Sequence, residues 1–226
     1  MCIAYLDTTT ALADRLIGEF ATAADHADAA RHGRPRRQRQ SLAVRALLRA
    51  VLAREVASPA WQLLRDPHGY PREAVAGTAR RAVSLAHSGE LVACATATGG
   101  AIGVDVERIA AGRPILGLAQ AAFGPTEIGD VARDGVTAFY RIWTLREALA
   151  KASAEGFELL VNRQDLVAGV TGAERRRVGE HTWDLAYWTV DGGYALAFAR
   201  EAHDATPIPP PWNIATPEAG RSICPA

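Results

Sequence analysis

The sequence predicts an α+β protein of two similar lobes, each a small and mostly antiparallel sheet packed with helices. The chain has 226 residues and 49% of them are hydrophobic, which is enough for one large core or two small ones. Segments with helical spacing of apolar residues alternate with segments of strand-like pattern. Each half runs from helix to strands. We therefore expect lobes at 1–110 and 111–205, related by a pseudo-twofold axis, and a proline-rich tail at 206–226.

The first half is predicted to contain two helices and then three strands, at 11–30, 37–56, 82–85, 91–98 and 101–107. The first helix is alanine-rich with scattered acids. The second is amphipathic, because apolar residues recur at helical spacing at Leu47, Leu48, Val51 and Leu52. A turn at 87–89 is expected between the first two strands, and the strand at 101–107 alternates apolar and other residues cleanly.

The second half is predicted to contain three helices and then strands, at 115–122, 125–132, 136–154, 158–168 and 182–199. Asp191-Gly192-Gly193 divides the last of these segments into a hairpin, because such residues suit a tight turn. The prolines after Thr206 indicate an extended or disordered tail.

Composition excludes several classes of protein. The formal net charge is zero, and the basic segment RHGRPRRQR contains no aromatic residue, so we expect no nucleic-acid partner. No run of about 18 apolar residues indicates a membrane span, and the first residues do not resemble a signal peptide. Cys2, Cys94 and Cys224 are too far apart to suggest a metal site or a disulfide framework, so a cytoplasmic location is expected.

Two acids on the predicted strand at 101–107 form the first candidate site. Asp105 and Glu107 lie on one face of the strand, about 6–7 Å apart, with Gly103 on the same face leaving space for a ligand. Two such carboxylates repel each other unless a cation or solvent relieves them, and Mg²⁺ prefers hard oxygen ligands. The alternative is an ordinary solvated strand face.

The predicted helix at 136–154 carries the second candidate site. Phe139, Trp143, Glu147 and Lys151 follow one another at intervals of four, so they share one stripe of the helix. Glu147 and Lys151 could simply form an exposed ion pair. However, Lys151 is the only lysine in a chain that otherwise uses arginine, and its compact ammonium can approach a phosphate where a guanidinium does not fit.

Two further features could bind anions. The predicted turn at 87–89 offers the side chains of His87 and Ser88 together with backbone N–H groups. The basic segment at 31–45 could contact a polyanionic ligand. Either feature could equally be an ordinary loop histidine or a solvated surface.

The order of these elements resembles the 4′-phosphopantetheinyl transferase superfamily, in its larger two-lobed form typified by the surfactin-synthetase activator. The strand reads GVDVE at 103–107, and the helix reads WTLREALAK at 143–151. The element AHS at 86–88 and the helix start FGPTE at 123–127 are also similar to family motifs. The resemblance covers about residues 31–200.

The resemblance implies roles at the matching positions. Asp105, Glu107 and Glu147 would bind Mg²⁺ at the pyrophosphate of coenzyme A, and Lys151 would contact that phosphate. Catalysis would depend on Glu147, Lys151 and Asp105, with Glu147 or a metal-bound water as the base. His87 would contact the 3′-phosphate, and Ser88, Arg39 and Arg45 would complete the coenzyme A site.

Three positions depart from the family pattern, namely Ala86 for a serine, Arg146 for a lysine, and Tyr70 for a lysine in a Gly-Lys-Pro loop. These departures bear on coenzyme A affinity more than on the chemistry. We expect the active site between the lobes, because the acids of the strand at 101–107 and of the helix at 136–154 come from opposite sides of the connector.

The expected activity is Mg²⁺-dependent transfer of phosphopantetheine to a serine of an apo acyl or peptidyl carrier protein, releasing 3′,5′-adenosine bisphosphate. The expected protein is a monomer with no nucleic-acid or membrane partner. Two alternatives stay open: a non-catalytic relative that binds coenzyme A or a carrier protein, and a relative redirected to another reaction. The sequence does not indicate which carrier or pathway is served.

Overall fold

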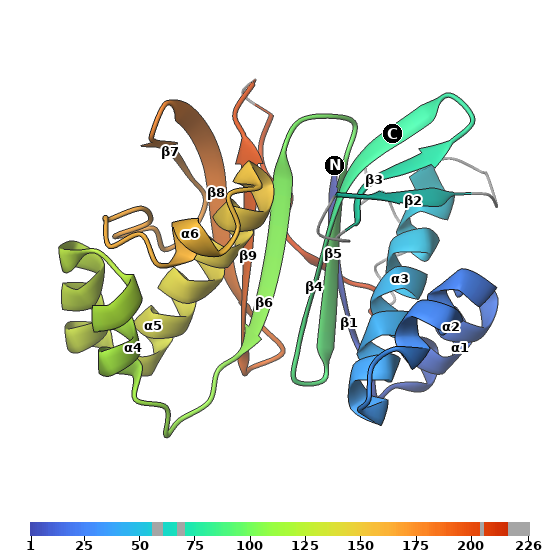
Figure 1. Ribbon diagram of the computed structural model, residues 1–226, viewed down its shortest axis with the longest axis horizontal. Coiled ribbons are helices and arrows are strands. Elements are labelled where there is room, and N and C mark those ends of the chain that lie inside the picture. The colour runs from blue at the N-terminus through green and yellow to red at the C-terminus, as the bar shows by residue number, and fades with distance from the viewer. Residues whose placement is uncertain (56–60, 67–70, 204–205, 217–226) are drawn as a thin grey trace. The chain divides into compact units, whose positions relative to one another are not determined.

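A computed structural model describes residues 1–55, 61–66, 71–203 and 206–216. The chain forms two compact units (Figure 1). Unit 1 comprises Met1–Gly99 with Pro209–Ala226, and unit 2 comprises Gly100–Ile208. Each unit contains a sheet with helices packed against it, which confirms the predicted α+β class of two lobes.

Unit 1 is built on a six-stranded sheet with the order β10-β1-β5-β4-β3-β2. Its strands are β1 (Cys2–Asp7), β2 (Gln62–Arg65), β3 (Pro71–Ala76), β4 (Ala79–Ser88), β5 (Leu91–Ala97) and β10 (Trp212–Asn213). All neighbours are antiparallel except β10, which runs parallel to β1. The expected strand at 82–85 is longer than predicted, so His87 and Ser88 belong to β4 and the turn begins at Gly89.

The helices of unit 1 are α1 (Ala11–Phe20), α2 (Ala23–Ala30) and α3 (Pro35–Glu55). The single helix predicted at 11–30 is wrong, because Thr22 begins a second helix: its side chain accepts a hydrogen bond from Asp25 N, and the Asp25 carboxylate accepts one from Thr22 N. The helix predicted at 37–56 is confirmed by α3, whose predicted apolar stripe is buried in the core of unit 1.

Unit 2 is built on a four-stranded antiparallel sheet with the order β6-β9-β8-β7. Its strands are β6 (Ile102–Arg108), β7 (Glu174–Val178), β8 (His181–Val190) and β9 (Tyr194–Glu201). The predicted hairpin is confirmed. Asp191 and Gly192 both have positive φ, at 45° and 65°, which matches the twist of the two strands that they join.

The helices of unit 2 are α4 (Ile115–Ala122), α5 (Pro125–Ser153) and α6 (Phe157–Leu160). Gly135, with φ 67° and ψ −140°, interrupts α5 and separates the two helices predicted at 125–132 and 136–154. The strand predicted at 158–168 is wrong. Its first residues lie in α6, and the backbone of its later residues forms hydrogen bonds with side chains of α5 instead of with another strand.

The two units repeat one topology. In each, a first strand is followed by three helices and then by further strands, and the order β1-β5-β4-β3 corresponds to β6-β9-β8-β7. The boundary lies between Gly99 and Gly100 and differs from the expected position at residue 110. The reason is that β6 pairs with β9 along its whole length and packs against α5.

The described part of the proline-rich segment is extended, as one of the two alternatives predicted, since β10 extends the sheet and Trp212 is buried in the core with 4% exposure. Cys94 is a buried free thiol. No helix in the described part of the chain combines the length and apolar character needed to cross a membrane.

Candidate active site in unit 2

The acidic strand and the Glu147 helix belong to the same unit. The sequence analysis assigned them to different lobes, but β6 lies against α5 within unit 2. Gly103 allows this close approach, because a Cβ atom there would lie 1.9 Å from the backbone oxygen of Ala148. The expectation that Gly103 leaves space for a ligand is therefore wrong: helix backbone fills that space.

Lys151 reaches from the helix to the strand. Its Nζ atom donates a hydrogen bond of 2.7 Å to Oδ1 of Asp105 and one of 3.1 Å to the backbone oxygen of Val104. The side chain of Asp105 is 9% exposed and that of Lys151 is 28% exposed, so this is a partly buried ion pair. The structure thus brings Lys151 and Asp105 into direct contact, 46 residues apart in sequence.

The carboxylates of this cluster influence one another. Burial raises the pKa of Asp105 above its usual range, although the charge and hydrogen bond of Lys151 oppose the shift. Burial also raises the pKa of Glu147 to about 7, and the negative charges of Asp105 and Glu107 add to the shift while Lys151 opposes it.

The predicted stripe on the helix is the partly exposed side of its second half. Trp143, Glu147 and Lys151 are each half-buried, whereas the residues between them, 144–146 and 148–150, are buried. Phe139 begins the stripe inside the core and stacks on Trp143, with ring centroids 6.0 Å apart. The partly exposed stripe thus continues from aromatic side chains of the core.

The donor chemistry of this cluster fits a divalent cation. Oδ2 of Asp105 is buried and has no hydrogen-bond partner, and the neighbouring carboxylates repel it. Carboxylate oxygens are the ligands that Mg²⁺ prefers. Among the described residues, however, no three acidic, histidine or cysteine side chains are grouped closely enough to hold a metal ion. The geometry alone therefore does not identify a metal centre.

His87 and Ser88 belong to a separate basic cluster in unit 1. A guanidinium nitrogen of Arg37 lies 2.6 Å from Nδ1 of His87. The adjacent Gly89 oxygen accepts hydrogen bonds from Arg36 Nε, at 3.2 Å, and Gln40 Nε2, at 2.7 Å. These bonds hold the start of α3 beside the turn between β4 and β5.

The two arginines favoured from the sequence lie elsewhere in unit 1. Arg39 donates to the backbone oxygen of Thr8, at 2.6 Å, and to Oδ1 of Asp14, at 2.8 Å. Arg45 is buried, and its guanidinium forms ion pairs with Asp25 (Nε to Oδ1, 3.6 Å) and with Asp28 (Nη2 to Oδ2, 3.7 Å). These contacts give no support to a role for Arg45 in binding coenzyme A.

The sequence analysis missed Arg37 as the arginine beside His87. A helical projection of α3 could have found it, since Arg36, Arg37 and Gln40 lie on neighbouring positions of one face.

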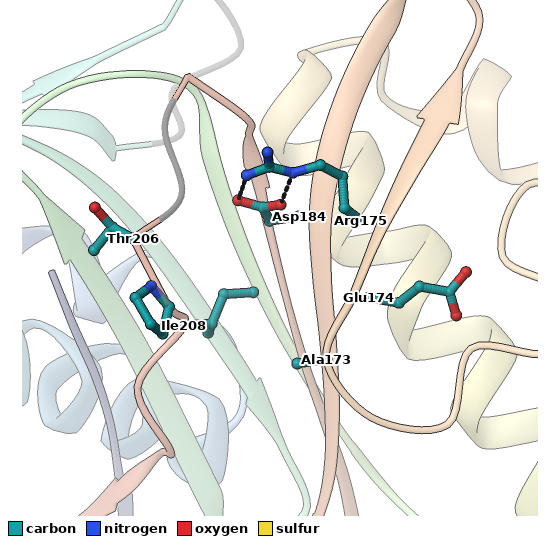
Figure 2. Close-up of a pocket in the computed structure, with 7 residues that line it drawn as sticks. Ala173, Glu174, Arg175, Asp184, Thr206 and Ile208 are labelled. Carbon is teal, nitrogen blue, oxygen red and sulfur yellow. Dashed lines mark hydrogen bonds and ion pairs between the residues drawn. The ribbon is translucent and has the colours of Figure 1, made fainter.

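A cavity of about 190 Å³ lies elsewhere in unit 2 and contains none of the predicted site residues (Figure 2). It lies beside β7 and residues 206–208. Arg175 forms a fork with Asp184 at its edge, with N–O distances of 2.7 and 3.1 Å. This pair joins β7 to β8 and is explained by the sheet itself.

Comparison with known proteins finds a similarity within unit 2. The family model described as the 4′-phosphopantetheinyl transferase superfamily matches residues 101–199, which include β6, α5 and the residues Asp105, Glu107, Glu147 and Lys151. This part of the chain is similar to the 4′-phosphopantetheinyl transferase superfamily. The resemblance inferred from the sequence is thereby confirmed at the level of the superfamily.

A relative within the superfamily is a protein of Synechocystis sp. whose name assigns it provisionally to the 4′-phosphopantetheinyl transferases. The two are 31% identical over 134 residues. The chain spans about half the length of this relative, since the matched region covers 56% of the chain and 54% of the relative. Such similarity does not itself assign a role to any single residue.

Proposed function

We propose that this protein is a 4′-phosphopantetheinyl transferase that moves the phosphopantetheine arm of coenzyme A to a serine of an apo acyl or peptidyl carrier protein. One observation carries the proposal. The part of the chain that matches the superfamily contains the hydrogen bond between Lys151 and Asp105, and the charges of both residues act on the Glu147 carboxylate. A clustered ammonium and carboxylates suit a reaction whose main difficulty is charge on phosphate oxygens.

The proposed reaction forms one bond and breaks one. The serine Oγ attacks the β-phosphorus of coenzyme A, the bond from that phosphorus to the bridging oxygen breaks, and 3′,5′-adenosine bisphosphate leaves. Glu147 is the proposed acceptor of the serine proton, and the Lys151 ammonium faces the phosphate charge. Asp105 orients Lys151 through their 2.7 Å hydrogen bond.

Mg²⁺ is the proposed metal, and Asp105, Glu107 and Glu147 would hold it once their side chains are drawn closer together than in the described structure. When bound, it would supply positive charge to the pyrophosphate. The unpartnered oxygen of Asp105 and the mutual repulsion of the acids support this assignment. The basic cluster of unit 1, with His87, Ser88 and Arg37, is proposed separately as a surface that binds a phosphate group, in line with the role expected for His87 and Ser88.

The direct test incubates the protein with coenzyme A, Mg²⁺ and apo-carrier proteins of the fatty-acid, polyketide and nonribosomal-peptide types. Mass spectrometry of each carrier should show the added mass of one phosphopantetheine arm on at least one type. Binding of coenzyme A with no transfer to any type would refute the proposal and support the non-catalytic alternative.

Glu147→Gln provides the residue-level test. This change removes the proposed base and one charged oxygen ligand but keeps the volume of the side chain, so we expect transfer to fall by roughly 10²–10⁴-fold. Glu155→Gln, at an exposed position just beyond the same helix, is the matched control and should transfer normally. Equal rates for the two variants would exclude Glu147 from the chemistry.

A further inference from the structure

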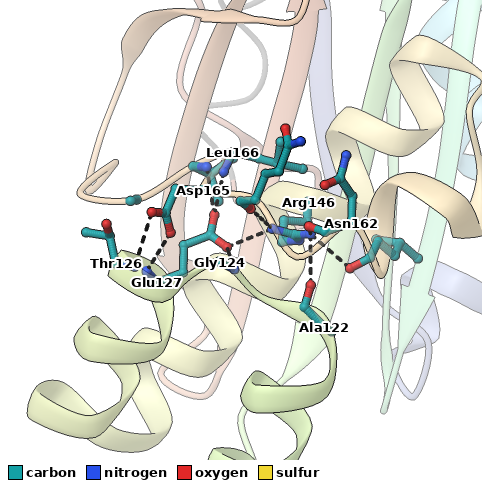
Figure 3. Close-up of polar contacts among 12 residues, drawn as sticks. Ala122, Gly124, Thr126, Glu127, Arg146, Asn162, Asp165 and Leu166 are labelled. Atoms are coloured by element: carbon teal, nitrogen blue, oxygen red, sulfur yellow. Dashed lines mark hydrogen bonds and ion pairs between the residues drawn. The ribbon is translucent and has the colours of Figure 1, made fainter.

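Arg146 and Glu127 form a completely buried ion pair in unit 2 (Figure 3). Both side chains are 0% exposed, and Nη1 of Arg146 lies 2.7 Å from Oε2 of Glu127. The two residues lie 19 positions apart on α5, on opposite sides of the Gly135 interruption. The pair therefore joins the two segments of the helix.

Arg146 also holds an irregular segment of backbone. Its two terminal nitrogens lie within hydrogen-bonding distance, 2.6–3.1 Å, of five carbonyl oxygens that share their four N–H groups with Glu127, namely those of Ala122, Leu159, Leu160, Asn162 and Gln164. Buried carbonyls need such partners, because an unpaired one costs about 1–3 kcal/mol. Four carbonyl groups between residues 159 and 164 thus face a single side chain.

Glu127 holds the next part of the same segment. Its Oε1 atom accepts hydrogen bonds from the backbone N–H groups of Leu166, at 3.0 Å, and Val167, at 2.8 Å. Asp165 accepts hydrogen bonds from the first N–H groups of α5, at Thr126 and Glu127 (Figure 3). The segment 159–167 is consequently fixed along its length to α5.

These contacts bear on the proposed active site because Glu147 follows Arg146 directly. One residue turns an α-helix by about 100°, so Arg146 points into the buried network while Glu147 lies on the partly exposed stripe. Any shift or rotation of α5 at Arg146 would move Glu147 and Lys151 with it. The distance from Lys151 to Asp105 depends on that placement.

We propose that Arg146 is a positioning residue, which fixes Glu147 and Lys151 opposite Asp105 by bonding α5 to Glu127 and to the segment 159–167. This inference rests on the proposed transferase function. It also explains the arginine at this position. A guanidinium offers a rigid fork of N–H donors, whereas a lysine ammonium offers three donors from one point and cannot bond both Glu127 and the dispersed carbonyls.

Arg146→Lys and Arg133→Lys are the matched variants for the test. Both lie on α5, but Arg133 is largely exposed and pairs with Asp130 and Asp134. The assay is run at a temperature at which both variants are fully folded, as checked by urea unfolding. Under these conditions we expect kcat of Arg146→Lys to fall by about 10- to 100-fold. The KM for coenzyme A should change little, and Arg133→Lys should match the wild type.

Hydrogen exchange separates this inference from the proposed function. Arg146→Lys should speed amide exchange at 147–151 and 159–167, and Arg133→Lys should not. A folded Arg146→Lys variant with wild-type kcat overturns the positioning role. If the wild type itself transfers nothing, the proposed function fails. Unchanged exchange in Arg146→Lys would then overturn the anchoring role as well, whereas faster exchange would retain it as a structural property.

Arg146→Met, which leaves Glu127 without its cation, should lose more stability than Arg146→Lys.

Discussion

Gly103 lies where β6 packs directly against the backbone of α5. Gly103→Ala would place a methyl carbon 1.9 Å from the backbone oxygen of Ala148 and 2.7 Å from the nitrogen of Ala152. Both atoms belong to helix backbone, which cannot rotate away as a side chain can. To reach even 3.0 Å, β6 and α5 must separate by about 1.1 Å, the difference from 1.9 Å.

That separation has two measurable consequences. Overpacking of a core costs about 1–3 kcal/mol and occasionally more, and a clash with rigid backbone belongs at the upper end of this range, so we expect a loss of about 3 kcal/mol in the free energy of unfolding. The hydrogen bond of 2.7 Å between Lys151 and Asp105 crosses the same contact. Its lengthening should also abolish transfer in the fraction that stays folded.

Gly129→Ala is the control for this experiment. Gly129 lies in the first half of α5, and a Cβ atom there would meet nothing within 4 Å. This change should stabilise the protein by about 0.4–1 kcal/mol, because alanine restricts the unfolded chain more than glycine does. Urea denaturation of both variants measures the difference. A Gly103→Ala protein as stable as the wild type would refute the close packing of β6 on α5.

Two further predictions concern stability. Burial alone would raise the pKa of Asp184, but hydrogen bonds from Arg175 and Arg200 outweigh it and lower the pKa below its usual range. The ionised carboxylate therefore stabilises the folded protein at neutral pH, and this stabilisation is lost as pH falls below about 4. Asp184→Asn should therefore lose less stability than the wild type between pH 6 and pH 3 in urea titrations, and an equal loss would contradict the assignment. Trp212→Ala should cost about 3–5 kcal/mol, because the ring is 4% exposed in the core of unit 1 and lies 4.6 Å from the Arg54 guanidinium. Thermal unfolding checks this, and a wild-type midpoint would show that the segment 206–216 contributes nothing to the fold.

The sequence predicted those elements whose evidence is local. Apolar residues at helical spacing predicted α3, and Asp191-Gly192 predicted the turn between β8 and β9. The shared stripe of Trp143, Glu147 and Lys151 followed from helix geometry alone. These features depend on neighbours within about ten residues, which a single sequence displays directly.

The features that the sequence did not predict depend on distant partners. The segment 158–168 contains apolar residues in a strand-like pattern, but its backbone bonds to Arg146 and Glu127 and not to another strand. The assignment of β6 to unit 2 depends on its pairing with β9, about 90 residues later. The burial of Arg45 depends on Asp25 and Asp28 in another helix, which a count of basic residues cannot show.

The repeated topology has an experimental consequence. The first strand of unit 2 carries Asp105 and Glu107, whereas the corresponding first strand of unit 1, Cys2–Asp7, has no such alternating acids. Unit 1 instead gathers cationic groups where α3 meets the end of β4. The acidic strand residues and these basic side chains thus belong to separate compact units, each with its own hydrophobic core, so the two groups can be substituted independently.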